Sequence, residues 1–216
     1  MIRSLSPCPR RAFGPPGWRR YAGLAIGLLL GLVAGAVPAS AGPLDYLISQ
    51  HYGTIGFSVS QLGIFSVDGR FTRFAGRLAI DQQHPTETRI DVTIEAGSAA
   101  MASSDAVSML RSPAYFDVAQ YPAIHFVSKS ISQVASGSFV IHGDLTIRGI
   151  THPQALEATL VNEQDPPSGP TIADFRVTGN LLRSAYGMMA NQNFVGNKVH
   201  LAIFIRLTLD SPAHGS

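Results

Sequence analysis

The chain has 216 residues, with 16 Lys plus Arg against 14 Asp plus Glu, and a formal net charge of +2. Five of the arginines lie within the first 20 residues, and no acidic residue comes before position 45. Without those five, 11 basic residues remain against 14 acidic ones, so the rest of the chain has a net charge near −3. A chain with this net charge is not attracted to the phosphates of a nucleic acid, which argues against a nucleic-acid partner.

The first 41 residues have the form of a secretory signal. Their arginines precede an apolar run over about residues 21–37, which is shorter than the ~18–20 residues that a helix needs to cross a bilayer and ends in an Ala-x-Ala site. We expect cleavage after Ala41, a single mature domain over residues 42–216 with no transmembrane span, and a periplasmic location. An uncleaved membrane anchor is the alternative. Arg10-Arg11 resembles a twin-arginine signal, but its distance from the apolar run favours the general secretory route.

The only cysteine, Cys8, lies in this leader. The mature chain is therefore expected to contain neither a disulfide nor thiol chemistry. Its stability must come from its hydrophobic core, and about 175 residues are enough to build one in a single domain.

After the leader, apolar residues recur at every second position in several short stretches. This alternation is typical of strands that bury one face. Gly and Pro separate the stretches at close intervals, which indicates tight turns and predicts a sandwich or a barrel. The expected strands are centred on residues 55–59, 90–94, 124–126, 139–141 and 201–209.

One segment departs from the alternation. Ser103 or Ser104 can cap a first helical turn and Asp105 suits its positive end, so we expect a short helix over residues 103–111. A second turn is expected around residues 113–118.

The stretch over residues 140–153 is the most distinctive part of the chain. Its β-branched residues alternate until Gly149 and Pro153 break the pattern. We interpret it as a strand that leaves a sheet at this point.

Four segments together resemble the YceI-like family of periplasmic lipid-binding proteins, through their order and spacing from about Tyr52 to Leu209. The family's usual histidines near the first strand are replaced by Tyr52 and Gln61, and its usual acidic residue after an Arg-Ser pair is replaced by Ala185. The scaffold is retained while several polar positions have become apolar. The four segments are residues 115–126 (115–118 followed by 121–126), 140–153, 183–188 and 195–199.

The resemblance implies an all-β fold, an antiparallel eight-stranded lipocalin-like barrel with one or two short helices. It also implies an apolar tunnel that holds an isoprenoid lipid such as a quinone or prenyl phosphate, for transport, storage or stress protection, and it allows a homodimer. A dry tunnel would trap a hydrocarbon chain, because about 25 cal/mol is gained per Å² of apolar surface removed from water.

The candidate tunnel walls are apolar residues on one face of the predicted strands, and the alternative is that they simply fill a closed core. Arg148 and Arg183 are candidates for contacts with the ligand headgroup, because a guanidinium can bind phosphate or quinone oxygens. Each of them could instead be a solvated charge or part of a structural ion pair. The wall candidates are Phe57, Val59, Phe71, Phe74, Phe126, Ile141, Phe175, Ile203 and Ile205.

The sequence contains no recognisable catalytic or metal-binding motif. Its seven histidines are scattered, without a His-x-x-x-His pair, so we predict no metal site. Three of them, His125, His142 and His200, lie opposite the apolar face of predicted strands and are expected to face solvent. No Gly-x-Ser-x-Gly elbow or Gly-rich phosphate loop is present, so we predict no catalytic residue and no cofactor.

Two alternatives to lipid binding stay open. A periplasmic stress protein with a filled barrel would act through a protein partner bound to its surface, and would carry no extractable ligand. A hydrolase or metal-assisted enzyme ranks below both binding functions, and would gather His and acidic residues in one concave site.

Overall fold

The computed structural model describes residues 44–80, 87–166 and 170–209. All of them fall within one compact unit. The predicted signal peptide and its cleavage site lie outside the described residues. Among the residues that are described, no helix is long and apolar enough to cross a membrane.

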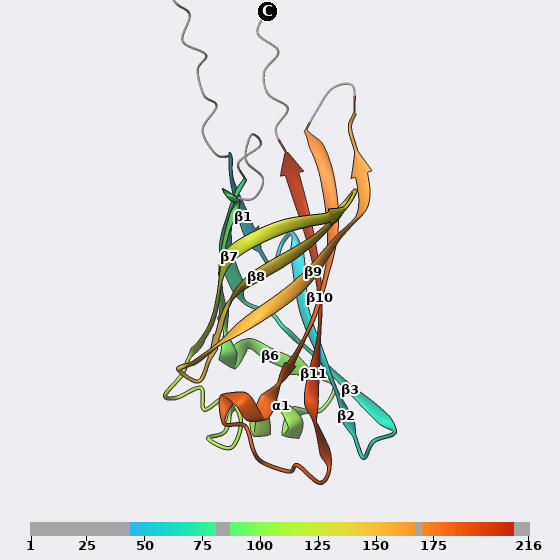
Figure 1. The fold of residues 1–216 in the computed structure, drawn as a ribbon. Coiled ribbons are helices and arrows are strands. Elements are labelled where there is room, and N and C mark those ends of the chain that lie inside the picture. The colour runs from blue at the N-terminus through green and yellow to red at the C-terminus, as the bar shows by residue number, and fades with distance from the viewer. Residues whose placement is uncertain (1–43, 81–86, 167–169, 210–216) are drawn as a thin grey trace, which may run out of the picture. The chain divides into compact units, whose positions relative to one another are not determined.

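A single antiparallel sheet makes up the fold and curls into a half-barrel (Figure 1). Its spatial order is β1-β4-β5-β7-β8-β9-β10-β11-β2-β3-β6. The strands are β1 (Leu44–Ser49), β2 (Gly53–Gln61), β3 (Phe65–Phe71), β4 (Phe74–Ile80), β5 (Arg89–Glu95), β6 (Ala99–Met101), β7 (Ala123–Ala135), β8 (Ser138–Ile147), β9 (Ile150–Gln164), β10 (Thr171–Leu182) and β11 (Val195–Leu209).

The all-β prediction is confirmed, but the described residues form eleven strands where eight were expected. Short strands explain the difference, since β6 has only three residues and shows no alternation. The chain also breaks between β3 and β4 at Thr72 and Arg73, whose backbone N–H groups donate to the carbonyl and hydroxyl oxygens of Ser98, both at 3.1 Å. This bend carries the chain from one side of the sheet order to the other.

The segment over residues 140–153 forms a hairpin, so the prediction that its strand leaves the sheet was wrong. β8 ends at Ile147 and β9 begins at Ile150, directly opposite it. Arg148 and Gly149 between them have φ values of 53° and 70°. Two consecutive residues with positive φ make the tight turn that matches the twist of antiparallel strands. The glycine therefore marks a turn, and both strands stay in the sheet.

The predicted short helix is confirmed as α1 (Ser104–Arg111). Ser103 caps it, because its hydroxyl accepts from the backbone N–H of Ala106 at 3.4 Å. The segment over residues 113–118 forms turns rather than a second helix. Two short 3₁₀ turns, η2 (Ala96–Ser98) and η3 (Arg183–Tyr186), complete the described helical structure.

Alternation decides which side chains face inward. On β7, Ile124 and Phe126 are buried while His125 and Val127 between them are exposed. His142 and His200 are exposed on their own strands, so the expectation that these strand histidines face solvent is confirmed. The apolar inner faces of the strands together form the core cluster.

Close packing of the curled sheet requires glycine at position 143. A Cβ atom there would lie 2.4 Å from the carbonyl oxygen of Val127 and 2.7 Å from the ring of Phe126. We expect Gly143→Ala to lower the free energy of unfolding by about 1–3 kcal/mol, measured by urea denaturation. The control is Gly97→Ala, because the nearest atom to a Cβ there is 4.0 Å away. Equal effects of the two changes would contradict this packing.

Candidate ligand-binding cavity

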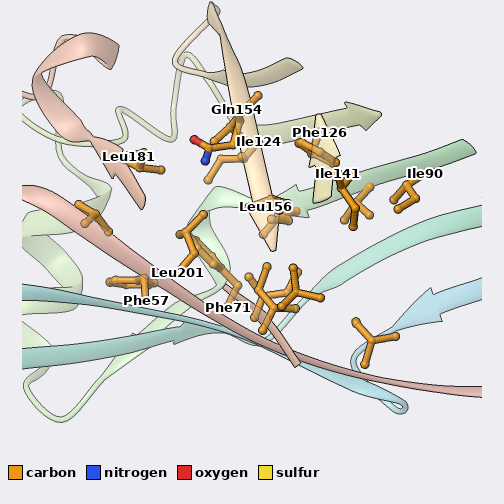
Figure 2. A pocket seen from close by; sticks show the side chains of 18 of the residues that line it. Phe57, Phe71, Ile90, Ile124, Phe126, Ile141, Gln154, Leu156, Leu181 and Leu201 are labelled. Atoms are coloured by element: carbon orange, nitrogen blue, oxygen red, sulfur yellow. The ribbon is translucent and has the colours of Figure 1, made fainter. Parts of the chain in front are cut away.

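The inner face of the sheet encloses a cavity of about 670 Å³. Residues of all eleven described strands and of α1 line it, and most of them are Ile, Leu, Val or Phe. Figure 2 shows side chains from several strands converging on the same space, with the amide of Gln154 among them. Small-molecule sites have volumes in this range and mostly apolar walls. The cavity is therefore the strongest candidate site in the described part of the chain.

The structure brings eight of the nine predicted wall residues to this cavity. Phe74 is the exception: it is buried in the core but does not line the cavity. It directly follows the bend at residues 72–73, so it does not continue the inward face that Phe71 ends. The eight that line the cavity are Phe57, Val59, Phe71, Phe126, Ile141, Phe175, Ile203 and Ile205.

Many lining residues were missed, although the same alternation contains them. Ile90, Val92 and Ile94 lie at every second position of β5. Leu201 belongs to the same kind of alternating series on β11. Extending each apolar face along its whole strand would have found these residues. Alternation does not mark Tyr115 and Phe116, which reach the cavity from turns, although they lie in a segment that carries the family resemblance.

Aromatic rings along the wall pack in tilted or edge-to-face pairs. The ring of Phe71 lies 5.3 Å from that of Phe57 and 5.8 Å from that of Phe116, and Phe139 lies 6.3 Å from Phe175. Such offset and tilted pairs stabilise one another beyond the area they bury. These ring contacts therefore stabilise this part of the cavity wall.

Burial of the lining differs from place to place. The lining is fully buried at Ile124, Ile147 and Leu181. It is only half-buried near the β7–β8 turn, at Ile131, Phe139 and Phe175. It is also half-buried beside the β2–β3 hairpin, at Val59, Val195 and Val199. The lining is half-buried along β5 and β11 as well, at Ile90, Val92 and Leu201, so these two places are candidate openings among several.

Arg183 lines the cavity and is 3% exposed. Its guanidinium donates to the carbonyl oxygens of Met188 at 2.7 Å, Val195 at 2.9 Å and Gly196 at 2.9 Å. It also lies 5.9 Å from the centre of the Tyr115 ring. Arg183 is therefore not a solvated charge, and it forms no ion pair with the described residues. Three of its five donors fix the loop between η3 and β11, so its first role is structural.

Arg148 does not line the cavity. It sits in the β8–β9 turn, where its guanidinium donates to the carbonyl oxygen of Gly187 at 3.1 Å. Of the two arginines predicted to contact a ligand headgroup, Arg183 lines the cavity and Arg148 does not.

Gln154 is the most buried amide in the cavity wall, at 8% exposed. Its amide nitrogen donates to the carbonyl oxygens of Ala155 at 2.7 Å and Asn180 at 3.1 Å. Both amide hydrogens are therefore in use, and the side-chain oxygen is left to accept. A hydroxyl or N–H group on a ligand is the donor that would suit it.

Tyr186 and His152 pack together beside η3. Their rings meet edge to face at 5.2 Å, and a ring nitrogen of His152 lies 3.1 Å from the carbonyl oxygen of Ala185. Burial raises the pKa of the Tyr186 phenol, so this group stays a neutral hydroxyl. Tyr186 therefore acts as a packing residue. Across the described ranges, no three His, Cys, Asp or Glu residues gather as a metal site would require.

A curled antiparallel sheet around an internal apolar cavity defines the structural class of this protein. Residues 46–207 match the family model of the YceI-like domain, and the chain belongs to this family. This confirms the resemblance found in the sequence. A UPF0312 protein of Photorhabdus laumondii is 33% identical over 183 residues, which cover 82% of this chain and 94% of that protein. A UPF0312 protein of a Shewanella species is 30% identical and covers 82% of this chain and 95% of its own length.

Solved structures share the fold at low sequence identity. BcnA of Burkholderia cenocepacia has a TM-score of 0.64 and is 19% identical, covering 72% of this chain and 96% of BcnA. A polyisoprenoid binding domain from Saccharophagus degradans, implicated in plant cell wall breakdown, has a TM-score of 0.55 and is 12% identical. That match covers 76% of this chain and 98% of the domain.

The contrast between the two arginines is testable. Arg183→Gln should lower the free energy of unfolding by about 2–4 kcal/mol, because three backbone carbonyls lose their donor. Arg148→Gln is the matched control and should cost less than about 1 kcal/mol, because only one half-exposed hydrogen bond is lost. Thermal and urea unfolding measure both. Similar small losses for the two variants would show that Arg183 does not fix the loop.

Proposed function

We propose that this chain binds the long apolar chain of an isoprenoid lipid in the cavity. The observation that carries the proposal is the cavity itself, about 670 Å³ enclosed almost entirely by aliphatic and aromatic side chains. Polar ligands would lose hydrogen bonds to water there without replacing them. A hydrocarbon chain loses none, and the proposed role requires no catalytic group.

The energetics favour a chain over a compact ligand. Each CH₂ group that moves from water into the cavity contributes about 0.8 kcal/mol. Ten such groups contribute roughly 8 kcal/mol before the cost of association, so micromolar or tighter binding needs no strong polar contact. Walls from all eleven described strands give the hydrocarbon chain apolar contact along its length.

Gln154 supplies the polar contact of the proposed site. Its free amide oxygen would accept a hydrogen bond from a hydroxyl group at the end of the lipid, while its amide hydrogens stay bonded to the backbone. Arg183 also lines the cavity, with two donors beyond those bound to carbonyls. Its role toward a ligand headgroup stays a prediction.

The shared fold supports the proposed class of ligand, and the predicted leader supports the proposed location. The fold is shared with a domain named as polyisoprenoid binding, which supports the class of ligand. The leader predicted over residues 1–41 supports export and a periplasmic location, where such a protein would carry or store the lipid. Both the location and a part in stress protection stay predictions.

Filling the cavity should block binding. Ala158 is buried on β9 and lines the cavity, so Ala158→Phe would place a ring in the space that the lipid occupies. Excluding two CH₂ groups forfeits about 1.6 kcal/mol, more than a tenfold increase in Kd. Titration with geranylgeraniol, followed by native mass spectrometry, measures this change.

The matched control is Thr159→Phe, which adds the same ring at the next position, on the exposed face of β9. It should leave the Kd for geranylgeraniol unchanged. Equal affinities for the two Phe variants would place the lipid outside the cavity. Failure of the unmodified protein to bind any prenol would contradict the proposed function.

A further inference from the structure

Five exposed apolar side chains belong to the β2–β3 hairpin and to the loop before β11. The hairpin projects from the end of the fold (Figure 1). Ile64 is 80% exposed, Phe65 60% and Phe194 59%. Large apolar side chains exposed to this degree, and next to one another, mark an interaction surface more often than chance. We call this the hairpin patch, and its residues are Leu62, Ile64, Phe65, Met189 and Phe194.

Hydrogen bonds hold the two segments of the patch together. The backbone N–H of Leu62 donates to the carbonyl oxygen of Phe194 at 2.8 Å, and Gln61 pairs with Val195 across β2 and β11. The amide nitrogen of Asn191 donates to the Tyr115 hydroxyl at 3.1 Å. The hairpin tip and the η3–β11 loop therefore present their apolar side chains as one fixed surface.

The hairpin turn itself breaks a local rule. Leu62 and Gly63 have φ values of 53° and 72°, and the N–H of Ile64 closes the turn on the carbonyl oxygen of Gln61 at 3.3 Å. Asn, Asp or Gly normally occupies the first of these positions, because a positive φ strains larger side chains. A leucine that is strained and also exposed gains nothing for folding.

Both segments of the patch lack charge. Residues 53–67 and 184–197 contain no Asp, Glu, Lys or Arg, although charged residues make up 14% of the chain. The polar residues between the apolar ones are neutral, including Gln61, Asn191 and Gln192. A charge-free tip loses little when it leaves water for the interface of a lipid bilayer.

We propose that the hairpin patch docks on the surface of a lipid bilayer. Three of the five patch residues lie at the tip of the projecting hairpin, which suits insertion between lipids. It is also continuous with the cavity, because Val195 pairs with the hairpin and lines the cavity where that lining is half-buried. This last step rests on the proposed function, since docking there would bring the opening to the membrane that holds the lipid.

Sedimentation with phosphatidylcholine vesicles tests the docking directly. The double variant Ile64→Ser, Phe65→Ser should bind the vesicles at least about tenfold more weakly than the unmodified protein, because two inserted apolar side chains are lost. The matched control replaces two equally exposed apolar residues outside the patch, Leu47→Ser and Val134→Ser, and should bind like the unmodified protein. Raising the salt concentration should not weaken binding, because no charge takes part.

Two readouts separate docking from cavity binding. The double variant should still bind geranylgeraniol added from solvent, which shows that the fold and the cavity are intact. Ala158→Phe should sediment with vesicles like the unmodified protein, although its Kd for the prenol is raised more than tenfold. The docking proposal is overturned if the unmodified protein stays in solution with vesicles, or if the control loses binding equally. It is also overturned if the patch instead mediates association of two copies that the double variant abolishes.

Discussion

The structure depends on one geometric constraint: every long strand turns alternate apolar side chains inward, while the curl of the sheet holds the opposite walls apart. A flat pair of sheets with the same residues would close into a solid core, since protein interiors pack as densely as organic crystals. Here a volume of about 670 Å³ stays between the walls. The same residues therefore stabilise the fold through contact with their neighbours and leave an apolar space for a ligand.

The polar side chains of the cavity wall form most of their hydrogen bonds with the protein's own backbone. Arg183 gives three donors to loop carbonyls, and Gln154 gives both of its amide hydrogens to the backbone of β9 and β10. Buried polar groups are stable only when they are bonded in this way. What they leave over, one amide oxygen and two guanidinium donors, is a small but directed polar surface inside an apolar site.

Alternation predicted the strands and most of the cavity wall, because a two-residue period is a local property that each strand shows by itself. Phe57 and Ile203 were found in this way. Phe74 was assigned wrongly because the preceding bend depends on Ser98, which is distant in sequence. The separate roles of Arg148 and Arg183 were equally hidden, since a positive φ and bonds to carbonyls across a loop leave no pattern in the residues themselves.

If the cavity holds an isoprenoid lipid, protein purified from its own cells should carry that lipid. Native mass spectrometry of the purified protein, followed by organic extraction, would identify anything bound. We expect an isoprenoid at close to one molecule per chain. A ligand-free mass that does not change after incubation with isoprenoid lipids would contradict it.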